Sequence, residues 1–360
     1  MTLDKIIMYI MAVGIILGAG DKILGNKFGL GEKFEEGLNT MGTLAIGMVG
    51  IICLAPVISD VIGPIIAPLC SAVSIDPAMF GSILACDMGG YPLAMNLAES
   101  KEIGLFSGIL IASMLGCTVS FTIPVGLGLI EKKDQPFFAK GLLIGLITIP
   151  IGGVLGSIAA GFDMKLVLLN TIPVLIISII LIIGLKCIPN AMIKGCIYFG
   201  RFIEIVILIG LALAGFESLT GIVIIKGMAP ISEAMGIVGS IGVVLMGILP
   251  MLTLLLKVLD KPLKTFGTKV GLDSSSAAGL IITLANAVPV FVMLKEMSPK
   301  GKVINVAFIV SASCVFGDHL GFTAGVEANM MTPLIVGKLA AGITAVFLAF
   351  IMTQNLKEQK

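Results

Sequence analysis

The stretch KLVLLNTIPVLIISIILIIGLK, from Lys165 to Lys186, decides the fold class. Between its two lysines lie 20 uncharged and mostly apolar residues, which as an α-helix extend about 30 Å, the thickness of the hydrocarbon core of a bilayer. Backbone groups in lipid must be hydrogen-bonded within a helix or a closed barrel, and this apolar run is continuous rather than alternating. The stretch therefore predicts a transmembrane helix.

The rest of the chain repeats this pattern. Of its 360 residues, 57% are hydrophobic and 12% are charged, whereas a soluble domain is about half apolar and about a quarter charged. We predict an all-α, polytopic integral membrane protein of about 10–12 transmembrane helices that forms one transmembrane domain over residues 1–360. The apolar segments are 5–20, 38–58, 77–98, 103–130, 137–161, 165–187, 197–225, 232–257, 274–296, 302–327 and 331–353.

Composition argues against several other classes. The net charge is +1 without a basic tail, so no nucleic-acid partner is expected. The seven cysteines are odd in number, lack zinc-ligand spacing and read as packing residues. With a single histidine, no metal site is expected. No cofactor and no enzymatic activity are expected either. The glycine-rich helices are compatible with a homodimer in the lipid bilayer but do not require one.

The expected location is the cell (plasma) membrane. The first apolar run, Ile6 to Gly18, has no signal-peptide cleavage site and is expected to stay as a helix. If every segment crosses, the basic loops Lys132–Lys133, Lys186–Arg201 and Lys257–Lys269 share one side, which would be cytoplasmic. Further lysines in the loop after the first helix and around Lys295–Lys302 then fall on the other side, so the orientation stays open.

Three pairs of strings predict an internal repeat. DKILGNKFG (21–29) resembles DKPLKTFG (260–267), the apolar run 37–57 resembles 271–290, and CDMGGY (86–91) resembles GDHLGF (317–322). The offsets are 231 to 239 residues. We predict two inverted repeats, approximately 1–161 and 232–360, joined by connecting helices in 162–231, as in alternating-access transporters.

Asp87 is the first candidate site residue. It lies within the apolar run ILACDMGGYPLA, and Gly89, Gly90 and Pro92 follow at once. A charge at the bilayer centre costs about 2.5–3.5 kcal/mol on insertion scales, so it needs a partner or a water-filled cavity. Glycine and proline weaken the helix. The run predicts a broken helix with free backbone groups beside a carboxylate, which is how transporters build midplane sites.

Asp318 is the counterpart of Asp87 in the predicted repeat, and His319 follows it. Nearby glycines again permit irregular backbone. Both aspartates could instead only cap half-helices, and His319 could be a satisfied buried side chain. Asn286, three residues before Pro289, would lie beside a carbonyl that proline leaves without a donor, either lining a site or binding a neighbouring helix. Lys338 either snorkels to the interface or pairs with an aspartate.

Several strings resemble the ethanolamine-utilisation transporter family. They are IIMYIMAVG (6–14), ACDMGGY (85–91), SFTIPVGLG (120–128), KGKVINVAF (300–308), GDHLGF (317–322) and IVGKLAAGITA (335–345). The likeness runs from the first helix to the last. It implies an inner-membrane protein that brings ethanolamine into bacteria able to break it down, without supplying a site or a coupling ion.

Ethanolamine is a cation at neutral pH, because its primary ammonium resembles that of lysine. It needs a carboxylate for the ammonium and a polar partner for the hydroxyl. The candidates are Asp87 and Asp318 for the ammonium, Asn286, His319 and Thr323 for the hydroxyl, and Tyr91 and Phe322 as aromatic faces toward the cation.

Other classes also need paired membrane aspartates. An ion-coupled cation–proton antiporter or another small-metabolite carrier suits the pattern equally well. An intramembrane aspartyl protease does not, because Val315-Phe316-Gly317 precedes Asp318 where such proteases carry Gly-x-Gly. A structural or signalling membrane protein would be favoured if both aspartates were replaceable.

Overall fold

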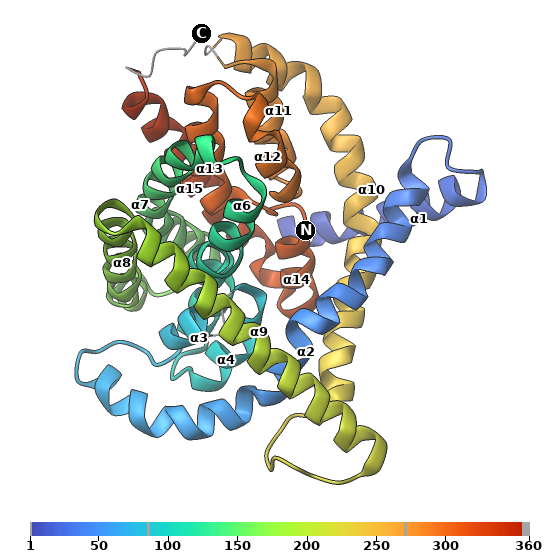
Figure 1. The fold of residues 1–360 in the computed structure, drawn as a ribbon. Coiled ribbons are helices and arrows are strands. Elements are labelled where there is room, and N and C mark those ends of the chain that lie inside the picture. The colour runs from blue at the N-terminus through green and yellow to red at the C-terminus, as the bar shows by residue number, and fades with distance from the viewer. Residues whose placement is uncertain (1, 85–86, 270–271, 355–360) are drawn as a thin grey trace.

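The protein is described by a computed structural model for residues 2–84, 87–269 and 272–354 (Figure 1). The chain is 85% helical, and the described residues contain no strand, which confirms the predicted all-α class. The helices are α1 (Leu3–Ile23), α2 (Leu30–Ser71), α3 (Met79–Leu84), α4 (Gly90–Leu97), α5 (Lys101–Leu105), α6 (Ile123–Leu129), α7 (Gln135–Ala160), α8 (Met164–Cys187), α9 (Pro189–Thr220), α10 (Ile231–Lys269), α11 (Ser274–Thr283), α12 (Val288–Met293), α13 (Pro299–Ala312), α14 (Asp318–Val326) and α15 (Met331–Met352).

Eight helical segments within the described ranges are long and apolar enough to cross a membrane. They are α1, α2, the continuous run from α5 to α6, α7, α8, α9, α10 and α15. Large apolar side chains point outward from these helices, among them Ile16 at 71% exposure and Leu219 at 90%. A surface of this kind is stable only against lipid, so the chain is a multi-pass membrane protein, in bacteria of the inner membrane.

The apolar segment 77–98 forms a hairpin instead of a crossing. Asp76, before α3, accepts hydrogen bonds from the backbone N–H groups of Glu99 and Ser100, after α4, at 3.2 and 2.8 Å. The two ends of the segment therefore meet. With six and eight residues, α3 and α4 are about 9 and 12 Å long, too short to cross about 30 Å of hydrocarbon. We call this segment hairpin one (76–100).

The apolar segment 274–296 folds in the same way. Asp273 caps α11 by accepting from the N–H of Ser276 at 2.8 Å, and it also accepts from the N–H of Ser298, which precedes α13, at 3.0 Å. Burial raises the pKa of the Asp273 carboxyl, but the hydrogen bonds from Ser276 and Ser298 outweigh burial and hold that pKa below its ordinary value. We call this segment hairpin two (273–298).

Contacts between loops distant in sequence show which helix ends share a face of the membrane. One face joins Lys101 to Glu327, Glu102 to Asp163, and Asp4 to Thr332. The opposite face joins Phe28 to Lys257, Asp134 to Lys302, and Lys140 to Met352. Neither hairpin crosses the membrane. Each long helix makes one crossing, and α13 and α14 together make one further crossing. The contacts of the two faces then alternate along the chain, as this topology requires.

In this topology the basic loops no longer fall on opposite sides of the membrane. All five lie on the second face: residues 22–33, 132–140, 186–201, 257–269 and 295–302. The first face carries mainly acidic residues: Glu99, Glu102, Asp163, Glu217, Glu233 and Glu327. We call them the basic face and the acidic face. The positive-inside rule predicts that the basic face is cytoplasmic.

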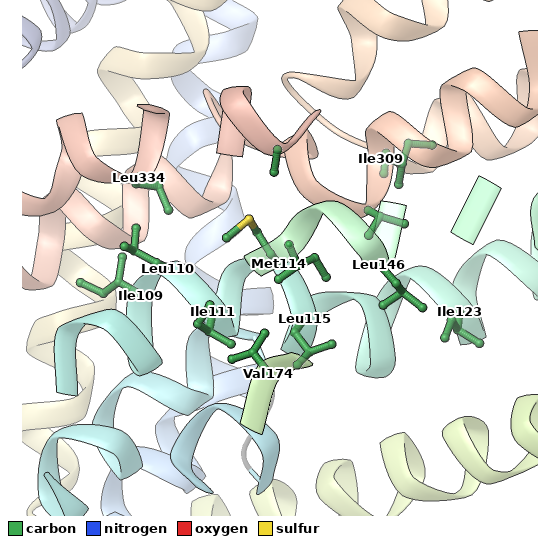
Figure 2. Close-up of a cluster of buried hydrophobic side chains, with 14 of the residues drawn as sticks. Ile109, Leu110, Ile111, Met114, Leu115, Ile123, Leu146, Val174, Ile309 and Leu334 are labelled. Atoms are coloured by element: carbon green, nitrogen blue, oxygen red, sulfur yellow. The ribbon is translucent and has the colours of Figure 1, made fainter. Parts of the chain in front are cut away.

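The interior is built around a π-helical stretch, Phe106–Gly116, in which every residue is buried. Its side chains meet Leu146 of α7, Val174 of α8, Ile309 of α13 and Leu334 of α15 in one apolar cluster (Figure 2). A π-helix is rare and occurs mainly at functional sites, because its i→i+5 bonds leave the local ladder irregular. This stretch packs against both α3 and α4 of hairpin one.

Each hairpin makes one further hydrogen bond to a neighbouring helix. The two bonds lie at a constant spacing along the sequence. The Ser107 hydroxyl donates to the carbonyl of Ala78 at 2.7 Å, and the Asn305 amide donates to the carbonyl of Ser276 at 2.9 Å. Each residue of the second bond lies 198 positions after its counterpart. This spacing differs from the 231 to 239 residues of the sequence matches, so it does not pair Asp87 with Asp318. The repeat bounds, approximately 1–161 and 232–360, stay a prediction.

The topology predicts which loops can be labelled from outside the cell. In a Cys187→Ser background, Lys101→Cys and Lys226→Cys should react with a membrane-impermeant maleimide in intact cells, and Lys295→Cys should react only in inverted vesicles. Five crossings separate Lys101 from hairpin two, which places their bases on opposite faces. Figure 1 shows the two hairpins at opposite ends of the molecule. Reaction of all three variants from one face would contradict this arrangement.

Candidate functional site

Helix α14 begins inside the protein because the backbone is interrupted after α13. In the link between them, the N–H groups of Cys314 and Phe316 donate to the carbonyls of Thr283 and Leu284 at the tip of hairpin two, at 3.0 and 2.9 Å. At Gly317 a Cβ atom would lie 2.3 Å from the carbonyl oxygen of Ala285, so no other residue fits there. The irregular backbone predicted before Asp318 is confirmed.

Hairpin one supplies the opposite wall. Its tip is a single 3-10 turn, Asp87–Gly89, between α3 and α4. The side chain of Asp87 lies outside the part of the chain that the structure describes. Gly108 of the π-helix lets this hairpin come close, because a Cβ there would lie 2.8 Å from the Cα of Tyr91. The tip is thereby pressed against the π-helical stretch.

These elements line a small cavity of about 10 Å³. It is lined by Met88, Gly108, Ile109, Ser113, His319, Phe322 and Thr323. Met88 directly follows Asp87, and His319 directly follows Asp318, so the segments of both membrane aspartates reach one site. A volume of this size holds about one water molecule.

The polar groups of the cavity present acceptors. His319 is 3% exposed, and its Nδ1 lies 3.2 Å from the carbonyl oxygen of Ser313. Since a carbonyl only accepts, Nδ1 is the donor, and in the neutral ring Nε2 is then an acceptor. The Thr323 hydroxyl donates to the carbonyl of His319 at 2.8 Å, which leaves its oxygen able to accept.

Lys338 brings a positive charge to the same region. Its side chain is fully buried, which rules out snorkelling, and its Nζ donates to the carbonyl oxygen of Ser113 at 2.7 Å. Ser113 also lines the cavity. The π-helical stretch therefore already holds one primary ammonium beside the cavity, through a backbone carbonyl.

The remaining predicted site residues are Tyr91, Phe322, Asp318 and Asn286. Tyr91 and Phe322 come together, with their rings edge to face and their centroids 5.7 Å apart. Asp318 is the half-buried first residue of α14. Asn286 is exposed at the tip of hairpin two, where its Oδ1 accepts from the N–H of Val288 at 2.8 Å, and it does not line the cavity.

The sequence interpretation missed the π-helical wall. Gly108 and Ser113 belong to the run FSGILIASMLG, which reads as an ordinary transmembrane helix. Its small residues at close spacing are the signal that a close backbone approach was possible there.

The family described as "Ethanolamine utilisation protein, EutH" matches residues 3–352. A "Probable ethanolamine permease EutH" of Listeria monocytogenes serotype 1/2a (strain 10403S) is 48% identical over all of this chain and 96% of the relative. The "Uncharacterized protein YxeR" of Bacillus subtilis (strain 168) is 44% identical over all of this chain and 98% of the relative. The "Probable ethanolamine permease EutH" of Salmonella typhimurium (strain LT2) is 42% identical over 98% of this chain and 96% of the relative. No solved structure matches the chain.

The buried ammonium of Lys338 predicts a measurable contribution to stability. In Lys338→Met the charge-assisted hydrogen bond to Ser113 is lost, which should lower the free energy of unfolding by about 1.5–3 kcal/mol. The control is Lys101→Met, whose ion pair with Glu327 is solvent-exposed on the lysine side and should contribute less than about 1 kcal/mol. Thermal unfolding of the purified variants in detergent measures both. Equal stability of Lys338→Met and the wild type would contradict the prediction.

Proposed function

The chain belongs to the EutH family of ethanolamine utilisation proteins, and from this premise we propose that it takes up ethanolamine through the cavity beside His319. The observation that carries the proposal is that the residues following Asp87 and Asp318 line one cavity. The names of the relatives from Listeria and Salmonella support ethanolamine as the substrate.

The chemistry of the cavity suits a small amino alcohol. The ammonium needs acceptors, and carboxylates at Asp87 and Asp318, the carbonyls of the interrupted backbone and Nε2 of His319 are acceptors. The substrate hydroxyl can donate to the oxygen of Thr323. The Tyr91 and Phe322 rings add apolar walls that can also face a cation.

The volume of the cavity bears on mechanism. Ethanolamine has four heavy atoms, and about 10 Å³ holds only one water. Binding therefore requires the tip of hairpin one or the Tyr91–Phe322 pair to move away from α14. Such movement at a midplane site is what alternating access requires.

Uptake of labelled ethanolamine into proteoliposomes tests the proposal. The wild-type protein should accumulate label faster than empty vesicles, and parallel assays with proton or sodium gradients identify any coupling ion.

Asp87→Asn should weaken transport, because removing one charge from a cation site costs on the order of 2–5 kcal/mol. Glu99→Gln is the control, since Glu99 lies at the base of hairpin one. A native rate in a normally inserted Asp87→Asn would remove Asp87 from the site, and no wild-type uptake would refute the function.

Recognition of the hydroxyl can be tested separately. Thr323→Val should weaken ethanolamine binding by about 0.5–1.5 kcal/mol, the worth of one hydrogen bond. It should leave competition by ethylamine, which lacks the hydroxyl, unchanged, and Thr323→Ser should keep the native preference. Equal losses for both amines in Thr323→Val would show that Thr323 does not bind the hydroxyl.

A further inference from the structure

A second, larger cavity lies on the acidic face. Its volume is about 540 Å³, enough for a small solute together with its hydration water. Residues of α2, α4, α10 and α14 line it, among them Ile52, Pro56, Tyr91, Asn96, Glu233 and Val326. We call this cavity the vestibule.

The vestibule adjoins the inner cavity through one aromatic pair. Tyr91 lines the vestibule, Phe322 lines the inner cavity, and their rings contact each other edge to face. Along α4, Asn96 lies nearer the base of hairpin one and Tyr91 nearer its tip. A solute that passes from Asn96 to Tyr91 thus moves toward the cavity beside His319.

The lining of the vestibule favours a cation. Glu233, an exposed residue in the first turn of α10, is its one charged lining residue among those described. The proline at position 56 removes the α-helical donor of the Ile52 carbonyl, and both Ile52 and Pro56 line the vestibule. Glu217 and Glu327 belong to the same face, where Glu327 is paired with Lys101 at 3.4 Å, and Lys226 is the cation of the 221–230 connection.

We propose that the vestibule is an external recruitment site for primary amines, in which Glu233 binds the ammonium before it passes the Tyr91–Phe322 pair. This inference rests on the proposed function and deepens it by naming the entrance. A carboxylate at the mouth of a low-dielectric cleft raises the local concentration of a cation and its association rate. Glu233 therefore acts on capture of the substrate and not on its passage through the protein.

The test separates capture from passage. In proteoliposomes of phosphatidylcholine and phosphatidylglycerol, where no lipid headgroup carries a primary amine, Glu233→Gln should raise KM for ethanolamine at least about threefold with unchanged kcat. Added salt should raise the wild-type KM, and this dependence should be weaker in Glu233→Gln, because salt screens exposed charges. Glu233→Asp should keep most of the native behaviour.

The matched control is Glu32→Gln. Glu32 is likewise an exposed glutamate in the first turn of a long helix, α2, but it lies on the basic face. Its replacement should leave KM and the salt dependence unchanged. An unchanged KM in Glu233→Gln, an equal rise in Glu32→Gln, or a fall in kcat alone would overturn the recruitment site while leaving ethanolamine transport intact. Absence of wild-type uptake would overturn the proposed function and the recruitment site together.

Discussion

The requirement that every backbone group at membrane depth be hydrogen-bonded governs this structure. Two carboxylates, Asp76 and Asp273, meet that requirement at the ends of the hairpins by accepting N–H groups from the chain that leaves each hairpin. Each bond turns an apolar segment of crossing length into one that returns to its own face. The hydrogen bonds at these two hairpins set the number of crossings. The face on which every later loop lies, and with it the separation of basic from acidic loops, follows from that number.

The fold class was predictable because continuous apolar runs have only one solution in lipid. The eleven apolar segments are present, nine as crossings and two as hairpins, within the described residues. Segment length could not distinguish a hairpin from a crossing, since 77–98 is as long and apolar as a true span. The distinguishing signal was a conflict in charge: Lys295, Lys300 and Lys302 fell on the wrong face while hairpin two was counted as a crossing. Charge distribution is a property of topology, and it remains informative where hydropathy is not.

The site was predictable in part. His319, Phe322 and Thr323 follow Asp318 on one short helix, so a broken helix at that point brings them to one cavity together. Asn286 also lies at a helix break, but its carboxamide accepts from the N–H of Val288 at the start of the next helix and stays exposed. Ser113 was invisible because its role depends on the π-helix, which places its carbonyl against Lys338. Local sequence shows where a helix breaks, whereas the partner of each freed group is set by packing between distant segments.

The two faces of the protein differ in a way that suits a cationic solute. On the acidic face, about 540 Å³ of space leads to the Tyr91–Phe322 pair. On the basic face, the start of α7 is tied to α13 by a buried ion pair between Asp134 and Lys302, 2.5 Å apart. Separating these charges without new partners would cost about 3–5 kcal/mol, the measured range for broken buried pairs. With the basic face cytoplasmic, as the positive-inside rule predicts, this conformation has its wider cavity on the outside. In the proposed transport cycle, any step that separates the Asp134–Lys302 pair would have to be offset by contacts formed elsewhere, such as those of an outer entrance closed over the ammonium.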